Sequence, residues 1–241
     1  MNITYLHNSG FAIEMDDVLL IFDYWKDVGK GRGLAYGTID AAGLSAYRRV
    51  IALASHAHPD HFNPVITTWP RVELVLSDDI LANAPNAVML SPGRSWTPPD
   101  DADGLRVEAF GSTDQGVSFL VSLRGAVIFH AGDLNCWHWQ DESSPEEAAV
   151  ARDAFARTLA PIALRVDGTP PHVALLPVDS RLGSDYDEGA LAMVRALKPR
   201  VVVPMHAHSD AQAVNAFAGR CGGDVRILLE RGQATAIDIA N

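Results

Sequence analysis

Three histidines and an aspartate lie within six consecutive positions of residues 55–62, which read SHAHPDHF. The whole chain has nine histidines in 241 residues. Neutral imidazoles and a carboxylate are suitable ligands for zinc, iron, manganese or nickel, and the lack of thiolates in the cluster argues against a closed structural zinc site. A solvated histidine-rich turn, or a set of capping residues, is the alternative interpretation. As a metal site, this loop would need further ligands from elsewhere in the chain.

The residues around the cluster indicate how its side chains are presented. The apolar run VIALAS, which ends at the cluster, is typical of a buried strand. Pro59 favours an extended residue before it and suits the first position of a helix, so a short helix is predicted to start there. His56 and His58 then point to one side of an extended chain, while Asp60 and His61 lie in the first helical turn and can reach a second position.

Two other apolar segments end in side chains that can bind metal. VIFHAGDLN, residues 127–135, is a predicted strand that runs into a Gly-Asp turn at Asp133. VVVPMHAHS, residues 201–209, is a predicted strand that ends at His206. Functional groups are often presented at strand ends, along one rim of a sheet. Asp133 and His206 are therefore the first candidates for the remaining ligands.

The rest of the chain predicts strands in the first half and alternating strands and helices in the last third. Further strands are expected at residues 72–76, 105–110, 117–123 and 173–176. One helix should begin with Ser144 as its N-cap and Pro145 at its first position. Two later helices, in DEGALAMVRALKP and DAQAVNAFAGRCG, should stop at Pro199 and at Gly222. We find no repeat or linker, so a single domain over residues 1–241 is predicted.

Composition limits the partners and the compartment. The formal net charge is −11, which disfavours nucleic acid as a partner because phosphate backbones are repelled. The two cysteines, Cys136 and Cys221, have neither metal-binding nor disulfide-framework spacing, which fits a reducing compartment. The N-terminus lacks a signal-peptide pattern, and no apolar stretch of about 18 residues occurs. We expect a cytoplasmic protein with no membrane partner.

Together these motifs resemble the metallo-β-lactamase superfamily. Its H-x-H-x-D-H loop matches the cluster, its bridging aspartate looks like Asp133 and its terminal histidine looks like His206. Phe22-Asp23, at the end of the opening strands, resembles the family's start, in which the aspartate supports the histidine loop. The resemblance implies the following metal ligands: His56, His58, Asp60, His61, Asp133 and His206. It also implies one or two divalent ions, zinc first, with manganese, iron and nickel as alternatives.

The resemblance covers nearly the whole chain and implies a fold. This fold is an α/β (α+β) structure, the αββα four-layer sandwich of the metallo-β-lactamase type, with two mixed sheets and the helices outside. The stretches HNSGFAIE, FHAGDLN and PMH look most like the branch that includes L-ascorbate-6-phosphate lactonase.

One ligand of the family has no counterpart here. A third histidine usually precedes the strand before the Gly-Asp turn, where residues 108–119 read EAFGSTDQGVSF. Asp114 is the best replacement by chemistry, since a carboxylate could complete a site with His56, His58 and Asp133. An ordinary turn with Gly116 explains Asp114 equally well. Without a replacement, only the metal bound by Asp60, His61, Asp133 and His206 would be held tightly.

The activity implied is that of a metallo-hydrolase. A binuclear metal site would hold water as hydroxide, which attacks a small ester, lactone or phosphoester, and an anionic substrate is one option. Asp60 and Asp133 are the catalytic candidates, Asp60 because it could orient the nucleophile or pass on a proton. A phosphodiesterase or nuclease of the same superfamily is an alternative. A non-catalytic metal-binding protein with a degenerate first site is another, and a homo-oligomer is left open.

Further polar residues are candidates for supporting the site or lining a substrate pocket. His7 resembles a histidine near the site of the lactonase branch, and a hydrogen-bonded core histidine is the alternative. Arg181 could clamp a carboxylate or phosphate of the substrate, or form a salt bridge with Asp179 or Asp185. Trp137 and His138 could wall a pocket or only pack a lid. The complete set of supporting residues is His7, Asp23, His130, Trp137, His138 and Arg181.

Overall fold

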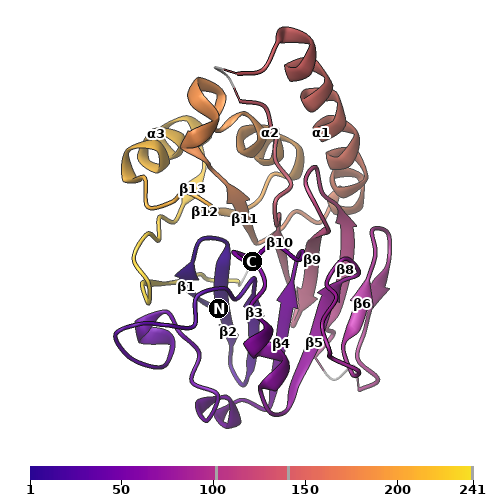
Figure 1. The fold of residues 1–241 in the computed structure, drawn as a ribbon, viewed down its shortest axis with the longest axis vertical. Coiled ribbons are helices and arrows are strands. Elements are labelled where there is room, and N and C mark those ends of the chain that lie inside the picture. The colour runs from indigo at the N-terminus through magenta and orange to yellow at the C-terminus, as the bar shows by residue number, and fades with distance from the viewer. Residues whose placement is uncertain (101–102, 140–141, 240–241) are drawn as a thin grey trace. The chain divides into compact units, whose positions relative to one another are not determined.

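The computed structural model describes residues 1–100, 103–139 and 142–239. The chain divides into two compact units, Met1–Leu90 with Leu228–Asn241, and Ser91–Ile227. Each unit is built on a seven-stranded mixed sheet (Figure 1). The single domain over residues 1–241 stays a prediction.

The first unit contains the sheet with strand order β14-β1-β2-β3-β4-β5-β6. Its strands are β1 Asn2–His7, β2 Gly10–Met15, β3 Val18–Phe22, β4 Arg49–Ala54, β5 Val72–Ser77, β6 Val88–Leu90 and β14 Ala234–Ala236. Pairing is antiparallel from β14 to β3 and parallel from β3 to β6. Every residue of β3 and β4 is buried, as expected for inner parallel strands with a nearly continuous apolar sequence. Three 3-10 helices complete this unit: Leu34–Tyr36, Gly43–Ala46 and Pro64–Thr68.

The second unit contains the sheet with strand order β13-β12-β11-β10-β9-β8-β7. Its strands are β7 Ser95–Trp96, β8 Arg106–Gly111, β9 Val117–Leu123, β10 Ala126–His130, β11 Val173–Pro177, β12 Val201–Met205 and β13 Asp224–Val225. Strands β10 to β13 are parallel and β7 to β10 antiparallel. Its helices are α1 Pro145–Val166, α2 Glu188–Leu197, α3 Ala211–Cys221 and the 3-10 helix Ser180–Asp185. Helix α1 contacts β8 and α2, and α2 contacts β11.

The predicted elements match the structure closely. All six strands predicted between residues 72 and 205 are present, with each end within one residue of its predicted position. Helix α1 begins with a capping box, in which the Ser144 side chain accepts from the Glu147 N–H and the Glu147 carboxylate accepts from the Ser144 N–H. Helix α3 ends at Gly222, which has a left-handed φ of 71°. Helix α2 ends at Lys198, also left-handed, just before the predicted stop at Pro199.

The prediction that a short helix starts at Pro59 is wrong. The chain makes only one turn there, in which the His61 and Phe62 N–H groups both donate to the His58 carbonyl, each at 3.0 Å. The Asn63 N–H donates instead to the Tyr24 carbonyl at 2.9 Å, so the helical hydrogen-bond pattern stops. Helical structure resumes only at Pro64–Thr68. The tertiary contact therefore overrides the local preference of a proline for a helix start.

Among the described residues, none of the helices combines the length and the apolar sequence needed to cross a membrane.

Candidate metal centre

The histidine loop of the first unit is anchored by one buried carboxylate. Strands β3 and β4 are parallel neighbours, so the residues that follow them, Asp23 and Ser55, lie at the same sheet edge. Asp23 is fully buried. Its Oδ1 accepts from the Ser55 N–H at 2.7 Å, and its Oδ2 accepts from the Ser55 hydroxyl at 2.7 Å. The same Oδ2 lies 2.7 Å from Nδ1 of His61. Asp23 thus holds both the start of the loop and a ring at its end.

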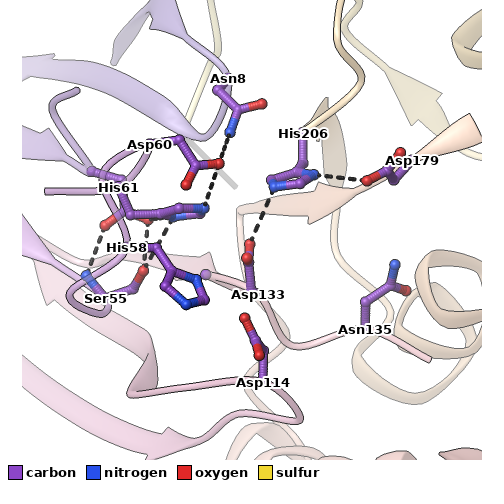
Figure 2. Close-up of polar contacts among 12 residues, drawn as sticks. Asn8, Ser55, His58, Asp60, His61, Asp114, Asp133, Asn135, Asp179 and His206 are labelled. Atoms are coloured by element: carbon purple, nitrogen blue, oxygen red, sulfur yellow. Dashed lines mark hydrogen bonds and ion pairs between the residues drawn. The ribbon is translucent and has the colours of Figure 1, made fainter. Parts of the chain in front are cut away.

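These contacts orient two imidazoles. Because Asp23 accepts a hydrogen bond from Nδ1 of His61, the lone pair of this imidazole lies on Nε2. Nε2 of His61 lies 3.6 Å from Oδ2 of Asp60. The Ser55 hydroxyl donates to Asp23, so the ring nitrogen Nδ1 of His56, 3.0 Å from Ser55 Oγ, is placed to donate to that oxygen. The second ring nitrogen of His56 is then available as a ligand. Figure 2 shows the Ser55 and His61 contacts.

His56 and His58 present nitrogens close to each other. Nε2 of His56 lies 3.0 Å from Nδ1 of His58. Two nitrogens bound at about 2.0–2.1 Å to a tetrahedral zinc ion would lie roughly 3.3 Å apart. The pair is therefore compatible with two ligands of one ion. His56 is fully buried, while His58 is partly exposed.

Three parallel strands of the second unit bring another group of polar residues to one edge. Strands β10, β11 and β12 are neighbours, and Asp133, Asp179 and His206 follow them in that order. Nε2 of His206 lies 3.7 Å from Oδ1 of Asp133, and Nδ1 of His206 lies 3.1 Å from Oδ2 of Asp179 (Figure 2). Asp114 offers a carboxylate oxygen within 4.8 Å of one from Asp133. Asp133 therefore lies within reach of both Asp114 and His206.

Asp179 is a charged group in a buried setting. Burial alone would raise the pKa of its carboxyl, but hydrogen bonds from Arg181 and His206 outweigh this and hold the pKa below the usual range. Arg181 donates through Nε at 2.9 Å to Oδ1 and through a terminal nitrogen at 2.5 Å to Oδ2. This is one of the salt bridges that the sequence left open for Arg181. The guanidinium is thus engaged by Asp179, which weakens its case as a clamp for a substrate anion.

Trp137 supports the same edge. Its indole N–H donates to the Asp133 carbonyl at 2.7 Å, and its ring meets the His206 ring edge-on, with centroids 5.8 Å apart. Trp137 therefore fixes the backbone of one candidate ligand and packs against another.

Three residues of these groups have a strained backbone. Asn8, Asp23 and His206 have φ values of 54°, 43° and 57°, in the left-handed region that few residues other than glycine adopt. Such strain persists where the surrounding structure holds it, and it is concentrated at functional sites. In His206, this conformation turns the chain sharply at the end of β12.

Comparisons with known proteins agree with this arrangement. No protein-family model matches the chain. A UPF0173 metal-dependent hydrolase from Ignicoccus hospitalis is 25% identical over 216 residues, covering 86% of this chain and 82% of the relative. The solved structure of a metallo hydrolase from the same archaeon has a TM-score of 0.68 at 21% identity and covers 99% of both chains. A metallo-β-lactamase fold protein from Bacillus subtilis has a TM-score of 0.61 at 11% identity, covering 97% of this chain and 98% of that one.

The chain has the fold of the metallo-β-lactamase superfamily. The predicted fold class is confirmed as the metallo-β-lactamase fold, with two mixed sheets and flanking helices. The curated relatives are named UPF0173 metal-dependent hydrolases, which agrees with the predicted enzyme class. The narrower resemblance to the lactonase branch stays a prediction.

His7 and His130 are also predicted supporting residues. His7 meets the Trp25 ring edge-on, with centroids 4.7 Å apart. His130 is fully buried, and its Nδ1 accepts from the Gly132 N–H at 3.1 Å, which stabilises the turn before Asp133. His130 therefore supports the turn before Asp133, while a role of His7 near the site stays a prediction.

His138 belongs to an ion-pair network. Its Nε2 lies 3.0 Å from Oε2 of Glu188 and 3.2 Å from a terminal nitrogen of Arg152, which also binds Glu188 and Asp185. Burial raises the pKa of the Glu188 carboxyl, but Arg152 and His138 lower it by more. Cys136, His138 and Glu188 form another group of side chains that could hold a metal ion. In this group, however, Glu188 is already paired with the cationic Arg152. A role of His138 in a pocket wall stays a prediction.

Sequence reasoning missed three supporting residues. Ser55 links His56 to Asp23, and Asp179 orients His206. Asp179 follows the predicted strand at 173–176, so the rule that found Asp133 and His206 could have found it too. Asn8, which donates to Asp60 at 3.0 Å, carries no comparable signal in the sequence.

Proposed function

We propose that this protein hydrolyses a small ester, lactone or phosphoester with the help of one or two divalent ions. The candidate metal donors of the first unit are His56, His58, Asp60 and His61, and those of the second are Asp133, His206 and Asp114. These donors are imidazole nitrogens and carboxylate oxygens, with no thiolate, which suits zinc, manganese, iron or nickel in a catalytic role. Which of these metals binds, and whether the site is binuclear, belongs to the proposal.

The orientation of the histidines carries this proposal. Asp23 accepts at Nδ1 of His61 and Asp179 lies at Nδ1 of His206, so each ring turns its Nε2 toward a candidate carboxylate ligand, Asp60 or Asp133. Carboxylate–histidine pairs of this kind fix the tautomer and raise the basicity of metal ligands.

The protein groups have distinct tasks in this chemistry. When bound, a divalent ion lowers the pKa of water to about 7 and thereby supplies a nucleophile at neutral pH. Asp60 is held by Asn8 and its side chain is about one-third exposed, so it can accept a proton from the nucleophile or pass one to a leaving group. Asp133 would be a ligand of the bound metal, while Asp23, Asp179 and Trp137 hold the candidate ligands in place.

The test is a metal-reconstitution assay. Chelator-stripped protein would be loaded with zinc, manganese, iron(II) or nickel, its metal content measured, and its turnover followed on lactones, carboxylic esters, phosphomonoesters and phosphodiesters. We expect bound metal and hydrolysis of at least one small substrate. His206→Asn should lower both, whereas His172→Asn serves as the matched control. His172 is also buried in this sheet, but its Nδ1 only accepts from the Val127 N–H at 3.0 Å.

The outcomes separate the alternatives. Metal binding without turnover on any of these substrates would indicate a non-catalytic metal-binding protein. Turnover confined to nucleic acids would indicate a nuclease, which the net charge of −11 disfavours. Absence of bound metal in the wild type would reject the proposal as a whole.

A further inference from the structure

Asn8 lies in the turn between β1 and β2 and is almost fully buried, with 2% of its surface exposed. Its backbone is left-handed, with a φ of 54°, and its N–H donates to the Tyr5 hydroxyl at 2.8 Å. The turn is closely packed at its end, because a Cβ at Gly10 would lie only 2.8 Å from the Asp23 carbonyl and 2.9 Å from that of His7. The surrounding chain therefore fixes the position of Asn8.

The side chain of Asn8 makes one directed contact. Its amide Nδ2 donates to Oδ2 of Asp60 at 3.0 Å (Figure 2). Its carbonyl Oδ1 is buried and has no hydrogen-bond partner among the described residues. A carboxylate can only accept, so the amide must turn its nitrogen toward Asp60 and leave its own oxygen unsatisfied.

This arrangement lowers the stability of the protein locally. A left-handed backbone at a residue other than glycine is strained, and a buried carbonyl without a partner loses its hydration. A residue selected for stability alone would avoid both. The contact with Asp60 is the compensating feature that the structure shows.

The contact determines the orientation of Asp60. Oδ2 of Asp60, the atom that Asn8 binds, is also the atom that lies 3.6 Å from Nε2 of His61. About one-third of the Asp60 side chain is exposed, and the Asn8 amide restrains its carboxylate through the hydrogen bond to Oδ2. With it, an imidazole nitrogen and a carboxylate oxygen are kept side by side, as two ligands of one ion require.

We propose that Asn8 is a positioning residue, which holds the Asp60 carboxylate in its metal-binding orientation at the expense of local stability. The inference rests on the proposed function, because it assumes that Asp60 and His61 bind a divalent ion.

The test compares metal affinity with stability in two variants. Asn8→Gly removes the amide and relieves the backbone strain, and Asn8→Ala removes the amide while keeping a Cβ. The matched control is Asn2→Ala. Asn2 lies on β1, the strand before this turn, and donates through its amide to Oε2 of Glu14, also at 3.0 Å. Zinc affinity would be measured by competition with a chromophoric chelator, and melting temperature on the metal-free proteins.

We expect both Asn8 variants to bind one zinc ion about 10–100-fold more weakly, the usual effect of losing a residue that orients a ligand. Asn2→Ala should bind zinc like the wild type. The melting temperature of metal-free Asn8→Gly should be no lower than that of the wild type. If Asn8 had only a structural role, its replacement would lower the melting temperature.

Unchanged zinc affinity in both Asn8 variants would overturn the inference while leaving the proposed function intact. A weaker affinity accompanied by a large drop in melting temperature in both variants would also overturn it, because partial unfolding would then explain the loss. If the wild type itself binds no zinc, manganese, iron or nickel, the proposed function fails and this inference fails with it.

Discussion

Asp179 Oδ2 lies 3.1 Å from Nδ1 of His206, so a buried carboxylate sits directly behind the imidazole that ends β12. The first unit contains the same pairing, with Asp23 Oδ2 at 2.7 Å from Nδ1 of His61. In both pairs, an aspartate that follows one parallel strand orients a histidine from a neighbouring segment. In each unit, an aspartate thus orients one imidazole so that its Nε2 can serve as a metal ligand.

Replacing Asp179 tests this relationship. Asp179→Asn should weaken the binding of one metal ion about 10–100-fold, because the tautomer and orientation of His206 are no longer held. It should also lower the free energy of unfolding by about 2 kcal/mol at neutral pH, the usual value for losing hydrogen bonds to a charged group. The measurements are zinc titration and urea unfolding of the metal-free protein.

The pH dependence of that stability loss has a definite sign. The pKa of Asp179 is lowered in the folded protein, so its contribution is present above the unfolded carboxyl pKa of about 3.9 and is lost as pH falls through the folded value. Wild type and Asp179→Asn should therefore converge in stability in strong acid. Asp224→Asn removes an exposed ion pair with Arg226 and is the control, for which we expect a change under 1 kcal/mol.

Asp133 is the residue whose loss should be most damaging to metal binding. Asp133→Ala removes the carboxylate that lies within reach of both Asp114 and His206, and most bound metal and activity should disappear with it. Asp153→Ala, which removes an exposed carboxylate paired with Arg157 on α1, should retain both. If elemental analysis finds full metal content in Asp133→Ala, the ligand assignment is wrong.

Asp114 can be tested as the substitute for the missing histidine. Asparagine supports turns as well as aspartate does but carries no charge, so Asp114→Asn separates the two interpretations. We expect this variant to fold normally and to lose one ion of two, or to bind it at least tenfold more weakly. Metal binding equal to that of the wild type would show that Asp114 only forms the turn with Gly116.

Metal removal should destabilise the protein. A ligand that binds only the folded state at 100 times its Kd stabilises by about 2.7 kcal/mol. Chelation with EDTA should therefore lower the melting temperature by several degrees, and added zinc should restore it. A melting temperature that does not respond to either treatment would contradict tight binding of zinc.

Cys136 should be an unreactive thiol. Burial, the largest effect, and the nearby Glu188 raise its pKa to about 11, so little thiolate exists at neutral pH. Alkylation by iodoacetamide at pH 8, followed by mass spectrometry, should be slow in the native protein and fast after unfolding. Rapid modification of native Cys136 would show that the thiol is more exposed than the structure indicates.

Much of the fold could be predicted because it depends on local patterns. Apolar runs located the strands β9 and β12 to the residue, and Ser144 with Pro145 located the start of α1. The turn at Pro59 could not be predicted, because a hydrogen bond from Asn63 to Tyr24 stops the helix. Contacts between distant segments have no signature in a local pattern.

For the candidate site too, one part could be predicted from the sequence and another could not. The sequence by itself determined which side chains can bind metal and that Asp133 and His206 follow buried strands, because residue type and hydrophobic periodicity are local properties. Only the tertiary structure decided which carboxylate orients which ring. Asp23 and His61 are 38 residues apart and Asp179 and His206 are 27 apart, and they meet because parallel strands align their carboxyl ends at one edge. The left-handed turn that directs Asn8 toward Asp60 likewise depends on packing against Tyr5 and Asp23.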